Sequence, residues 1–215
     1  MDAIVQISVG RPKDLDKRQR ILDSAKTLFL KHGYVGSSMN QIAATAGVSK
    51  LTVYSHFQDK ANLFTAAIED TCSQLLHTQP LQLQHAHEFH AKFLHACQLN
   101  LDLVCLPEAL KLEHLLLNLS VQQKGLMQQF YAASHGRMRQ MWQAFFQQAI
   151  ELGCLQHVSL SEMIDCIASL LLGARHHELL LGLRDIPTAA EKQQIIQQSS
   201  QLFLLKYQTG SSSML

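Results

Sequence analysis

The sequence predicts an all-α protein in which a three-helix N-terminal domain with a helix-turn-helix precedes a larger C-terminal helical domain. Three observations predict this fold class. Apolar residues recur at helical spacing along most of the 215 residues, and strand signals are missing. Four prolines and ten glycines leave room for long helices, and a chain of this length can bury a substantial core. Residues 38–60 read as two short helices joined by a tight turn.

The helix-turn-helix is predicted from caps and apolar spacing. Ser38 and Gln41 have the spacing of a capping box, which starts the first short helix. Gly47 permits the left-handed turn, and Ser49 can cap the second helix. The predicted buried positions are Met39, Ile42, Ala43, Ala46, Val53 and Phe57. The second helix then exposes small and hydrogen-bonding residues, which suits the major groove of DNA.

The domain boundaries are predicted from residues that start or end helices. Residues 1–13 read as a flexible basic arm, and residues 14–32 as a helix that Gly33 ends. Residues 14–60 form the predicted helix-turn-helix domain. Asp59 is placed to cap a helix that runs to about residue 78. The C-terminal domain is predicted over residues 61–207, with a loose tail over residues 208–215.

The charge distribution is consistent with nucleic-acid binding, although the net charge is only +1. Residues 10–60 carry nine Lys and Arg against four Asp and Glu, and the rest of the chain is mildly acidic. A basic module can neutralise phosphates. Taken alone, the same asymmetry is also explained by a solvated protein face.

Three motifs resemble those of the TetR/AcrR family of bacterial transcriptional regulators. They are FLKHGY at residues 29–34, SMNQIAATAGVS at residues 38–49, and a Y-x-x-F-x-x-K element made by Tyr54, Phe57 and Lys60. The resemblance covers residues 14–70, about a quarter of the chain. Leu51 departs from the glycine of many members, so the operator sequence does not carry over. The resemblance implies a dimer that binds double-stranded DNA and a body that encloses a small-molecule ligand.

The predicted contacts to DNA fall into three groups. Lys50, Leu51, Thr52 and Ser55 are expected at base edges. Phosphates are expected near the helix starts and, by the resemblance, near Tyr54 and His56. Arg11 is expected either in the minor groove or in a disordered solvated tail. The predicted DNA-binding residues are Ser38, Asn40, Ser49, Lys50, Leu51, Thr52, Tyr54, Ser55, His56, Lys60 and Arg11.

Five further helices are predicted in the C-terminal domain. Their ranges are 88–104, 108–118, 121–152, 160–183 and one that ends near residue 207. Ser159 with Glu162, and Thr188 with Glu191, have the spacing of capping boxes that start the last two helices.

A homodimer is predicted because residues 163–183 are apolar nearly all round. One face can pack within its own subunit and another needs a partner, as in the four-helix bundle that the resemblance implies. The alternative is a central helix buried within a monomer. The predicted interface residues are Ile164, Ile167, Leu171, Leu179, Ile195, Leu202 and Phe203.

A ligand pocket is implied by the resemblance, and apolar, aromatic and histidine side chains of the C-terminal domain offer a lining. Aromatic and methionine residues at helical spacing more often form core, so both interpretations stay open. The candidate ligand-binding residues are Phe89, Phe93, Met127, Phe130, Met138, Trp142, His114, His135 and His176.

Other classes of site and of protein have little support in the sequence. The histidines between residues 85 and 95 lack a completing set of ligands, so no metal site and no cofactor are expected. No nucleophile elbow, phosphate loop or acid–base pair predicts an enzyme. No secretory signal and no membrane span are read, because residues 175–178 interrupt the most apolar stretch. A cytoplasmic location is therefore expected.

The predicted function is a dimeric repressor that a small apolar or amphipathic ligand releases from a palindromic operator. In the family that the chain resembles, efflux and detoxification genes are common targets. The five cysteines read as small buried hydrophobes. Two alternatives stay open: a regulator switched by oxidation of Cys97 and Cys105, and a helical ligand-binding module that does not bind DNA. Activation in place of repression depends on the operator position.

Overall fold

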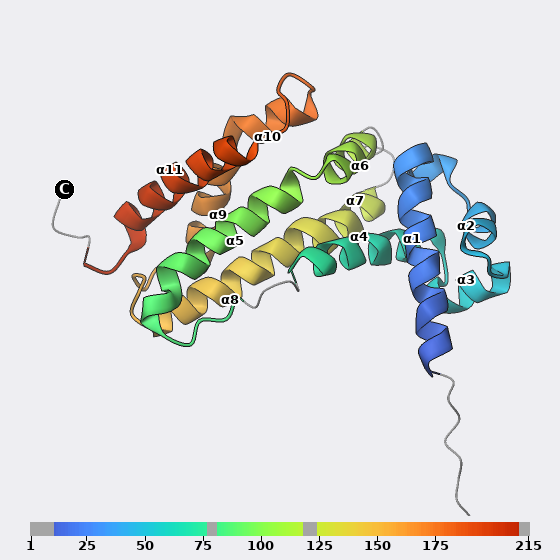
Figure 1. Ribbon diagram of the computed structural model, residues 1–215, viewed down its shortest axis with the longest axis horizontal. Coiled ribbons are helices and arrows are strands. Elements are labelled where there is room, and N and C mark those ends of the chain that lie inside the picture. The colour runs from blue at the N-terminus through green and yellow to red at the C-terminus, as the bar shows by residue number, and fades with distance from the viewer. Residues whose placement is uncertain (1–10, 77–80, 118–123, 211–215) are drawn as a thin grey trace, which may run out of the picture. The chain divides into compact units, whose positions relative to one another are not determined.

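The computed structural model describes residues 11–76, 81–117 and 124–210 (Figure 1). The chain divides into two compact units, Met1–Asp70 and Thr71–Leu215. We call them unit 1 and unit 2 and describe each by itself. Within the described residues the secondary structure is helical, apart from an isolated bridge between Leu155 and Gln208. None of the described helices is long and apolar enough to cross a membrane.

Unit 1 contains three helices and most of a fourth, and it includes the predicted helix-turn-helix. The helices are α1 (Arg11–Gly36), α2 (Met39–Ala46), α3 (Lys50–Phe57) and α4 (Lys60–Leu76), of which α4 continues into unit 2. Helix α1 begins three residues earlier than predicted, because Pro12 is compatible with a first helical turn. Gly33 interrupts its last turns with φ 70° and ψ 176°, where the sequence predicts the helix to stop.

The core of unit 1 joins α1 to α4 and to the helix-turn-helix. Ile21, Leu22 and Ala25 are fully buried on α1. The ring of Phe29 packs edge-on against that of Phe64, with 5.1 Å between the ring centroids. A salt bridge of 2.6 Å between Lys26 Nζ and Asp70 Oδ2 connects the same two helices. These contacts hold α1 and α4 together, and this pair of helices supports α2 and α3.

Unit 2 is a bundle of antiparallel and crossing helices. Its helices are α5 (Phe89–Val104), α6 (Pro107–Leu117), α7 (Lys124–Tyr131), α8 (Arg137–Glu151), α9 (Leu160–Leu171), α10 (Gly173–Leu180) and α11 (Ala189–Tyr207). A 3-10 turn (Ala86–Glu88) precedes α5. Helix α11 packs against both α5 and α9, and α8 packs against α5 and α9. Figure 1 shows α11 running alongside α5.

The centre of unit 2 is an aromatic cluster contributed by α5, α8 and α11. Phe93 is fully buried and lies within 6.3 Å of five other ring centroids. Phe146 and Phe203 stack with 5.1 Å between their centroids. Such ring pairs contribute packing energy beyond their buried area. The members are Phe89, Phe93, Trp142, Phe145, Phe146, Phe203 and Tyr207.

The helix predicted over residues 121–152 contains one irregular turn. Residues 121–123 lie outside the described residues, and α7 and α8 are joined by a π-helical turn at Ala132–Gly136. The buried positions pass from Ala133 to Met138, a step of five residues that a π turn accommodates. Apolar periodicity therefore places both helices correctly, but the turn between them departs from regular α-helix.

The helix predicted over residues 160–183 is wrong as a single element. Helix α9 ends at Leu171, and α10 begins at Gly173, which has φ +48°. This left-handed conformation suits glycine, so Gly173 breaks the helix. The Nη2 atom of Arg175 donates to the carbonyls of Leu170 and Leu171, at 2.8 and 3.1 Å. These bonds satisfy carbonyl groups that the break leaves without helical partners.

The two predicted capping boxes of unit 2 have different outcomes. Thr188 and Glu191 form the complete box at the start of α11. Ser159 caps α9 through the Glu162 N–H. The Glu162 carboxylate instead accepts hydrogen bonds from Lys206 at 2.9 Å and Tyr207 at 3.0 Å. Two donors on α11 thus bind the Glu162 carboxylate, which in a complete capping box would accept from the Ser159 N–H.

The predicted loose tail is partly ordered. The Gln156 N–H donates to the Tyr207 carbonyl at 2.8 Å, and Thr209 Oγ1 donates to the Gly153 carbonyl at 2.6 Å. These bonds tie the start of residues 208–215 to the loop after α8. Residues 211–215, like residues 1–10 of the predicted arm, lie outside the described residues.

Candidate nucleic-acid interface

The turn between α2 and α3 has the conformation that the sequence predicts. The Ser38 hydroxyl accepts from the Gln41 N–H at 3.2 Å, and Gln41 Oε1 accepts from the Ser38 N–H at 3.0 Å, which confirms the capping box. Gly47 is left-handed at φ 64°, and its N–H donates to the Ala44 carbonyl. Ser49 Oγ accepts from the Thr52 N–H at 3.1 Å and starts α3. Local hydrogen bonds therefore fix the angle between the two helices.

One side of α3 is buried in unit 1 and the opposite side is exposed to solvent. Val53 is fully buried and Phe57 is 4% exposed. The Arg18 guanidinium lies 5.3 Å from the centroid of the Phe57 ring. Leu51, by contrast, is 80% exposed. A helix of eight residues with one face seated and the opposite face in solvent can enter a DNA groove as a rigid unit.

The exposed side of α3 brings together most of the residues predicted to read DNA. Lys50, Leu51, Tyr54 and Ser55 are exposed, and Thr52 is half-buried. The Lys50 ammonium lies 5.6 Å from the Tyr54 ring centroid. The hydroxyls of Ser49 and Thr52 are hydrogen-bonded to each other at 2.8 Å. Ammonium, hydroxyl and apolar groups are the groups that base edges and phosphates accept.

Ser38 and Asn40, predicted near phosphates, are exposed at the start of α2. The side chain of Arg11 lies outside the described residues, although its backbone is in α1. The structure thus places the polar groups at the start of α2 at the surface.

His56 has a partner within unit 1. Its Nε2 lies 3.3 Å from Asp14 Oδ1, and its side chain is 14% exposed. This geometry directs the imidazole to the first turn of α1, and the phosphate contact of His56 stays a prediction. The sequence did not indicate the contact, since the two residues are far apart in the chain.

Lys60 is also committed to unit 1. Its ammonium donates to the main-chain carbonyls of Tyr34 at 2.8 Å and Ser37 at 3.0 Å, and it lies 4.4 Å from the Tyr34 ring centroid. Burial lowers the pKa of Lys60. Burial, followed by the charge of Asp59, raises the pKa of the Tyr34 phenol. These bonds tie α4 to the end of α1, and the phosphate contact of Lys60 stays a prediction.

The residues predicted to line a ligand pocket are mostly core. Phe89, Phe93 and Trp142 belong to the aromatic cluster, and Phe130 and Met138 are at most 8% exposed. Met127 is half-buried and His114 is exposed. The helical spacing of the buried members is therefore that of core residues, which is the alternative considered from the sequence. Core packing is the observed role of most of this set.

Five polar side-chain atoms nevertheless lie buried in unit 2 without a hydrogen-bond partner among the described residues. Three of them are His95 Nε2 and Asn100 Oδ1 on α5 and Trp142 Nε1 on α8, and the other two, Arg175 Nε and His176 Nδ1, belong to α10. A buried polar group without a partner costs free energy unless water or a ligand satisfies it. Of these, the sequence indicated Trp142 and His176.

His135 and His176 both interact electrostatically with the carboxylate of Glu113. His176 Nε2 lies 3.3 Å from Glu113 Oε2. Burial raises the pKa of Glu113, but the His176 hydrogen bond and the histidine charges outweigh burial, so the net shift is downward. Burial lowers the pKa of His135. Among the described residues no group of three or more His, Cys, Asp or Glu could hold a metal ion.

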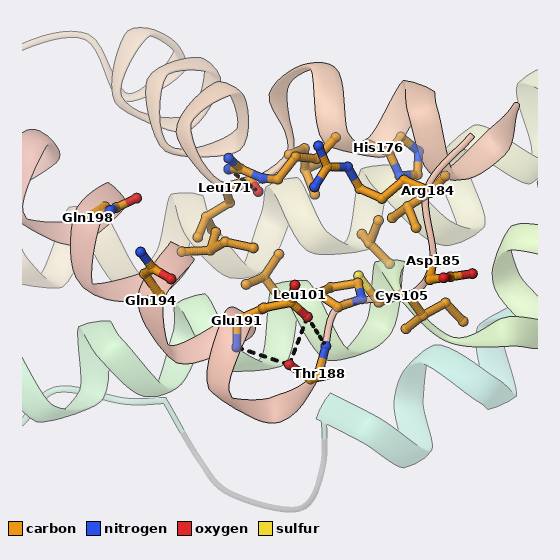
Figure 2. A pocket seen from close by; sticks show the side chains of 17 residues that line it. Leu101, Cys105, Leu171, His176, Arg184, Asp185, Thr188, Glu191, Gln194 and Gln198 are labelled. Atoms are coloured by element: carbon orange, nitrogen blue, oxygen red, sulfur yellow. Dashed lines mark hydrogen bonds between the residues drawn. The ribbon is translucent and has the colours of Figure 1, made fainter. Parts of the chain in front are cut away.

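A cavity of about 560 Å³ lies elsewhere in unit 2, between the end of α5, α9, α10 and the start of α11 (Figure 2). His176 is the predicted ligand residue that lines it. Arg175 and Arg184, which the sequence reasoning missed, line it as well. Three residues predicted for the dimer interface also face it, namely Leu171, Leu179 and Ile195. The break at Gly173, visible only in three dimensions, creates this arrangement.

The residues predicted for the dimer interface differ in their exposure within the single chain. Ile164, Ile167, Leu171 and Phe203 are at most 5% exposed within the single chain. The reason is that α9 packs against both α8 and α11 of its own unit, which uses up its apolar stripe. Leu202 is 55% exposed, and Leu179 and Ile195 are half-buried. The other apolar residues left exposed here are Leu181, Leu183, Ile186 and Leu205.

Three of the five cysteines, Cys72, Cys97 and Cys105, are buried as the sequence predicts, whereas Cys154 and Cys166 are half-buried. Cys97 and Cys105 are buried as free thiols. Burial raises the pKa of Cys97 to about 12 and also raises that of Cys105. The thiolate is the form that reacts with oxidants, so neither residue is primed for oxidation near neutral pH.

Two family profiles match the chain. One, described as "Bacterial regulatory proteins, tetR family", matches residues 21–67. The other, described as "AefR-like transcriptional repressor, C-terminal domain", matches residues 92–209, which is more than half of the chain. The first profile covers α1 to α4, where the helix-turn-helix lies, and the second covers most of unit 2.

Individual proteins agree with the profiles. The transcriptional repressor AcnR of Corynebacterium diphtheriae is 36% identical over 59 residues, so the match spans 27% of this chain and only 31% of AcnR. The uncharacterized regulator YvkB of Bacillus subtilis is 27% identical over 192 residues, 86% of this chain and 94% of YvkB.

A solved structure titled "Flavonoid-responsive Regulator FrrA" is 25% identical, with a TM-score of 0.73 over 90% of this chain and 98% of that one. The structural similarity thus extends from the helix-turn-helix through unit 2. The chain belongs to the TetR family of bacterial transcriptional regulators, which are DNA-binding proteins and not enzymes.

Proposed function

We propose that the protein is a repressor that binds a palindromic operator as a homodimer and is released by a small apolar or amphipathic ligand. The observation that carries the proposal is the exposed side of α3. It presents Lys50, Leu51 and Ser55 to solvent, while Val53 and Phe57 hold the helix in unit 1. Helix starts and basic side chains nearby supply phosphate contacts.

The test of DNA reading is an unbiased selection from random double-stranded DNA with the full chain and its variants. Lys50→Ala and Leu51→Ala are expected to relax the recovered motif at single positions, each costing about 1–3 kcal/mol of discrimination. Lys111→Ala is the matched control, because Lys111 is exposed in unit 2. Recovery of no motif, together with no binding at low salt, would refute the function.

Homodimerisation is supported by the apolar residues that unit 2 leaves exposed near its C-terminal helices. Leu202 and Leu205 are 55% and 72% exposed on α11. Exposed apolar patches of this kind mark interaction surfaces. A two-fold dimer would present two copies of α3 to successive major grooves about 34 Å apart. Efflux or detoxification genes are the targets that we propose by analogy with the family.

The dimer is tested by sedimentation velocity of Leu202→Glu and Leu205→Glu, which are expected to shift the chain toward monomer. Gln201→Glu is the matched control, since Gln201 is exposed on the same helix. Unchanged sedimentation of both leucine variants would place the interface elsewhere.

Ligand release is supported by the polar atoms of α5 and α8 that have no partner in the core, those of Asn100 and Trp142 among them. FrrA, to which the chain is similar, is described as flavonoid-responsive. A ligand needs only to prefer the conformation that does not bind DNA. Trp142 is the single tryptophan, so quenching of its emission by a flavonoid, followed by release of labelled operator DNA, tests the step directly.

A further inference from the structure

The cavity between α5, α10 and α11 contains a cation that no carboxylate balances. Arg175 is half-buried, and its Nε atom is buried without a hydrogen-bond partner among the described residues. Its Nη2 atom donates to two main-chain carbonyls at the end of α9. Carbonyl dipoles offset part of the cost of burying a charge, but they leave the positive charge itself uncompensated.

The other charged residues of the cavity are engaged or lie at its edge. Arg184 is 50% exposed at its side chain and pairs with Glu178 at 2.6 Å. The Glu191 carboxylate is held by the N–H and hydroxyl of Thr188, at 2.8 and 2.7 Å (Figure 2). Asp185 is exposed. No ion pair joins any of these acids to Arg175 in the described part of the chain.

The rest of the cavity suits an apolar body. Leu101, Val104, Leu179 and Ile195 contribute to its lining, on the side of α5 and on α10 and α11. The volume of about 560 Å³ falls within the range of small-molecule sites. His176 also lines the cavity, and its Nδ1 is buried without a partner.

We propose that this cavity binds a monocarboxylate with an apolar body, whose carboxylate pairs with Arg175. A guanidinium presents donors in a planar fork that matches a carboxylate. Its Nη1 atom, which has no hydrogen-bond partner among the described residues and is not among the buried polar atoms, supplies the donor that a ligand oxygen would accept. The cavity is distinct from the aromatic cluster, and the proposal concerns binding by unit 2 alone, so it does not depend on whether the chain reads DNA.

The experiment is calorimetric titration of the full chain, without DNA, with octanoate and with 1-octanol as the uncharged probe of equal length. Octanoate is expected to bind more tightly than octanol. Arg175→Met is expected to weaken octanoate binding at least about tenfold and to leave octanol binding unchanged. Arg139→Met is the matched control, because Arg139 pairs with Asp165 at the surface of α8 and α9.

Two further variants keep the test decisive if Arg175→Met does not fold. Arg175→Lys keeps the charge and loses the fork, so it should weaken octanoate binding by a smaller factor. Leu179→Trp fills the cavity and should abolish binding of both probes. Absence of octanoate binding to the wild type, equal affinity for octanol, or retention of octanoate binding in Leu179→Trp would each overturn the proposal. Operator binding is measured separately, so a failure of the proposed function has a different readout.

Discussion

The ammonium group of Lys60 donates to the Tyr34 carbonyl at 2.8 Å and lies 4.4 Å from the centroid of the same residue's ring. A side chain at the first position of α4 thus closes the end of α1. The sequence motif places Lys60 after α3, where a contact to DNA is the obvious interpretation. Its observed partners make it a structural cation.

Replacement of Lys60 should therefore lower stability. Lys60→Met removes the donor to two carbonyls and the cation–π contact, and the expected loss is about 1–2 kcal/mol in the free energy of unfolding. Lys50→Met, at an exposed position of α3, should change stability little. Urea unfolding followed by circular dichroism measures both. Equal midpoints for the two variants would mean that the Lys60 contacts contribute nothing.

Ser49 separates helix capping from DNA binding. Ser49→Ala removes the cap of α3 and should cost about 1 kcal/mol of stability. Ser49→Asp keeps a capping oxygen, so its melting temperature should stay near that of the wild type. The added negative charge faces DNA phosphates in the proposed complex, so operator affinity should fall by about tenfold or more. A Ser49→Asp protein that binds operator normally would place this helix start away from the backbone.

Glu88 gives a pH dependence of known sign. Its carboxylate accepts from the N–H groups of Gln84 and His85 and pairs with Lys92, which together lower its pKa from 4.5 to about 2. A lowered pKa in the folded state stabilises the protein above the unfolded value, and this stabilisation is lost as the pH falls through the folded value. Glu88→Gln should therefore be less stable than the wild type at pH 6.

The difference in melting temperature between wild type and Glu88→Gln should shrink between about pH 4.5 and pH 2. The comparison with the variant cancels the titration of other acids. Glu151, whose one side-chain partner among the described residues is the Gln147 amide, supplies the control in Glu151→Gln. A difference independent of pH would exclude the charge of Glu88 as its cause.

Gly173 and Gly125 should respond in opposite directions to the same substitution. Gly173 has φ +48°, so Gly173→Ala is expected to cost about 1 kcal/mol through backbone strain, although no atom lies within 4 Å of the added Cβ. Gly125 is helical in α7 with equally open surroundings, so Gly125→Ala should stabilise by about 0.5 kcal/mol. Thermal unfolding of both variants checks the pair. The same sign for both would contradict the conformational account.

The parts of the fold that the sequence predicts are those fixed locally. The caps at Ser38, Ser49 and Thr188 involve partners three residues away, and each is observed. Glu162 has the same local spacing, yet Lys206 and Tyr207, more than forty residues further on, take its carboxylate. Spacing alone does not reveal such competition between partners.

The candidate sites differ in the same way, between features fixed by local sequence and features fixed by distant contacts. The exposed side of α3 is predicted because a short helix with two apolar anchors has one possible orientation. The cavity around Arg175 is not predicted, because it depends on the break at Gly173 and on which faces of α5 and α11 remain uncovered. For Phe93 and Trp142 the sequence leaves both roles open, because apolar periodicity does not distinguish a cavity lining from a core.

The π-helical turn at Ala132–Gly136 has a consequence for comparing this chain with its relatives. The turn takes up one more residue than regular α-helix, and this residue shifts the numbering of every later position in α8 by one. A relative without it would have its counterpart of Trp142 one position earlier. An ungapped alignment through this helix would therefore pair buried positions of one protein with exposed positions of the other, and inherited residue roles beyond Gly136 would be misassigned unless a single gap is placed at the turn.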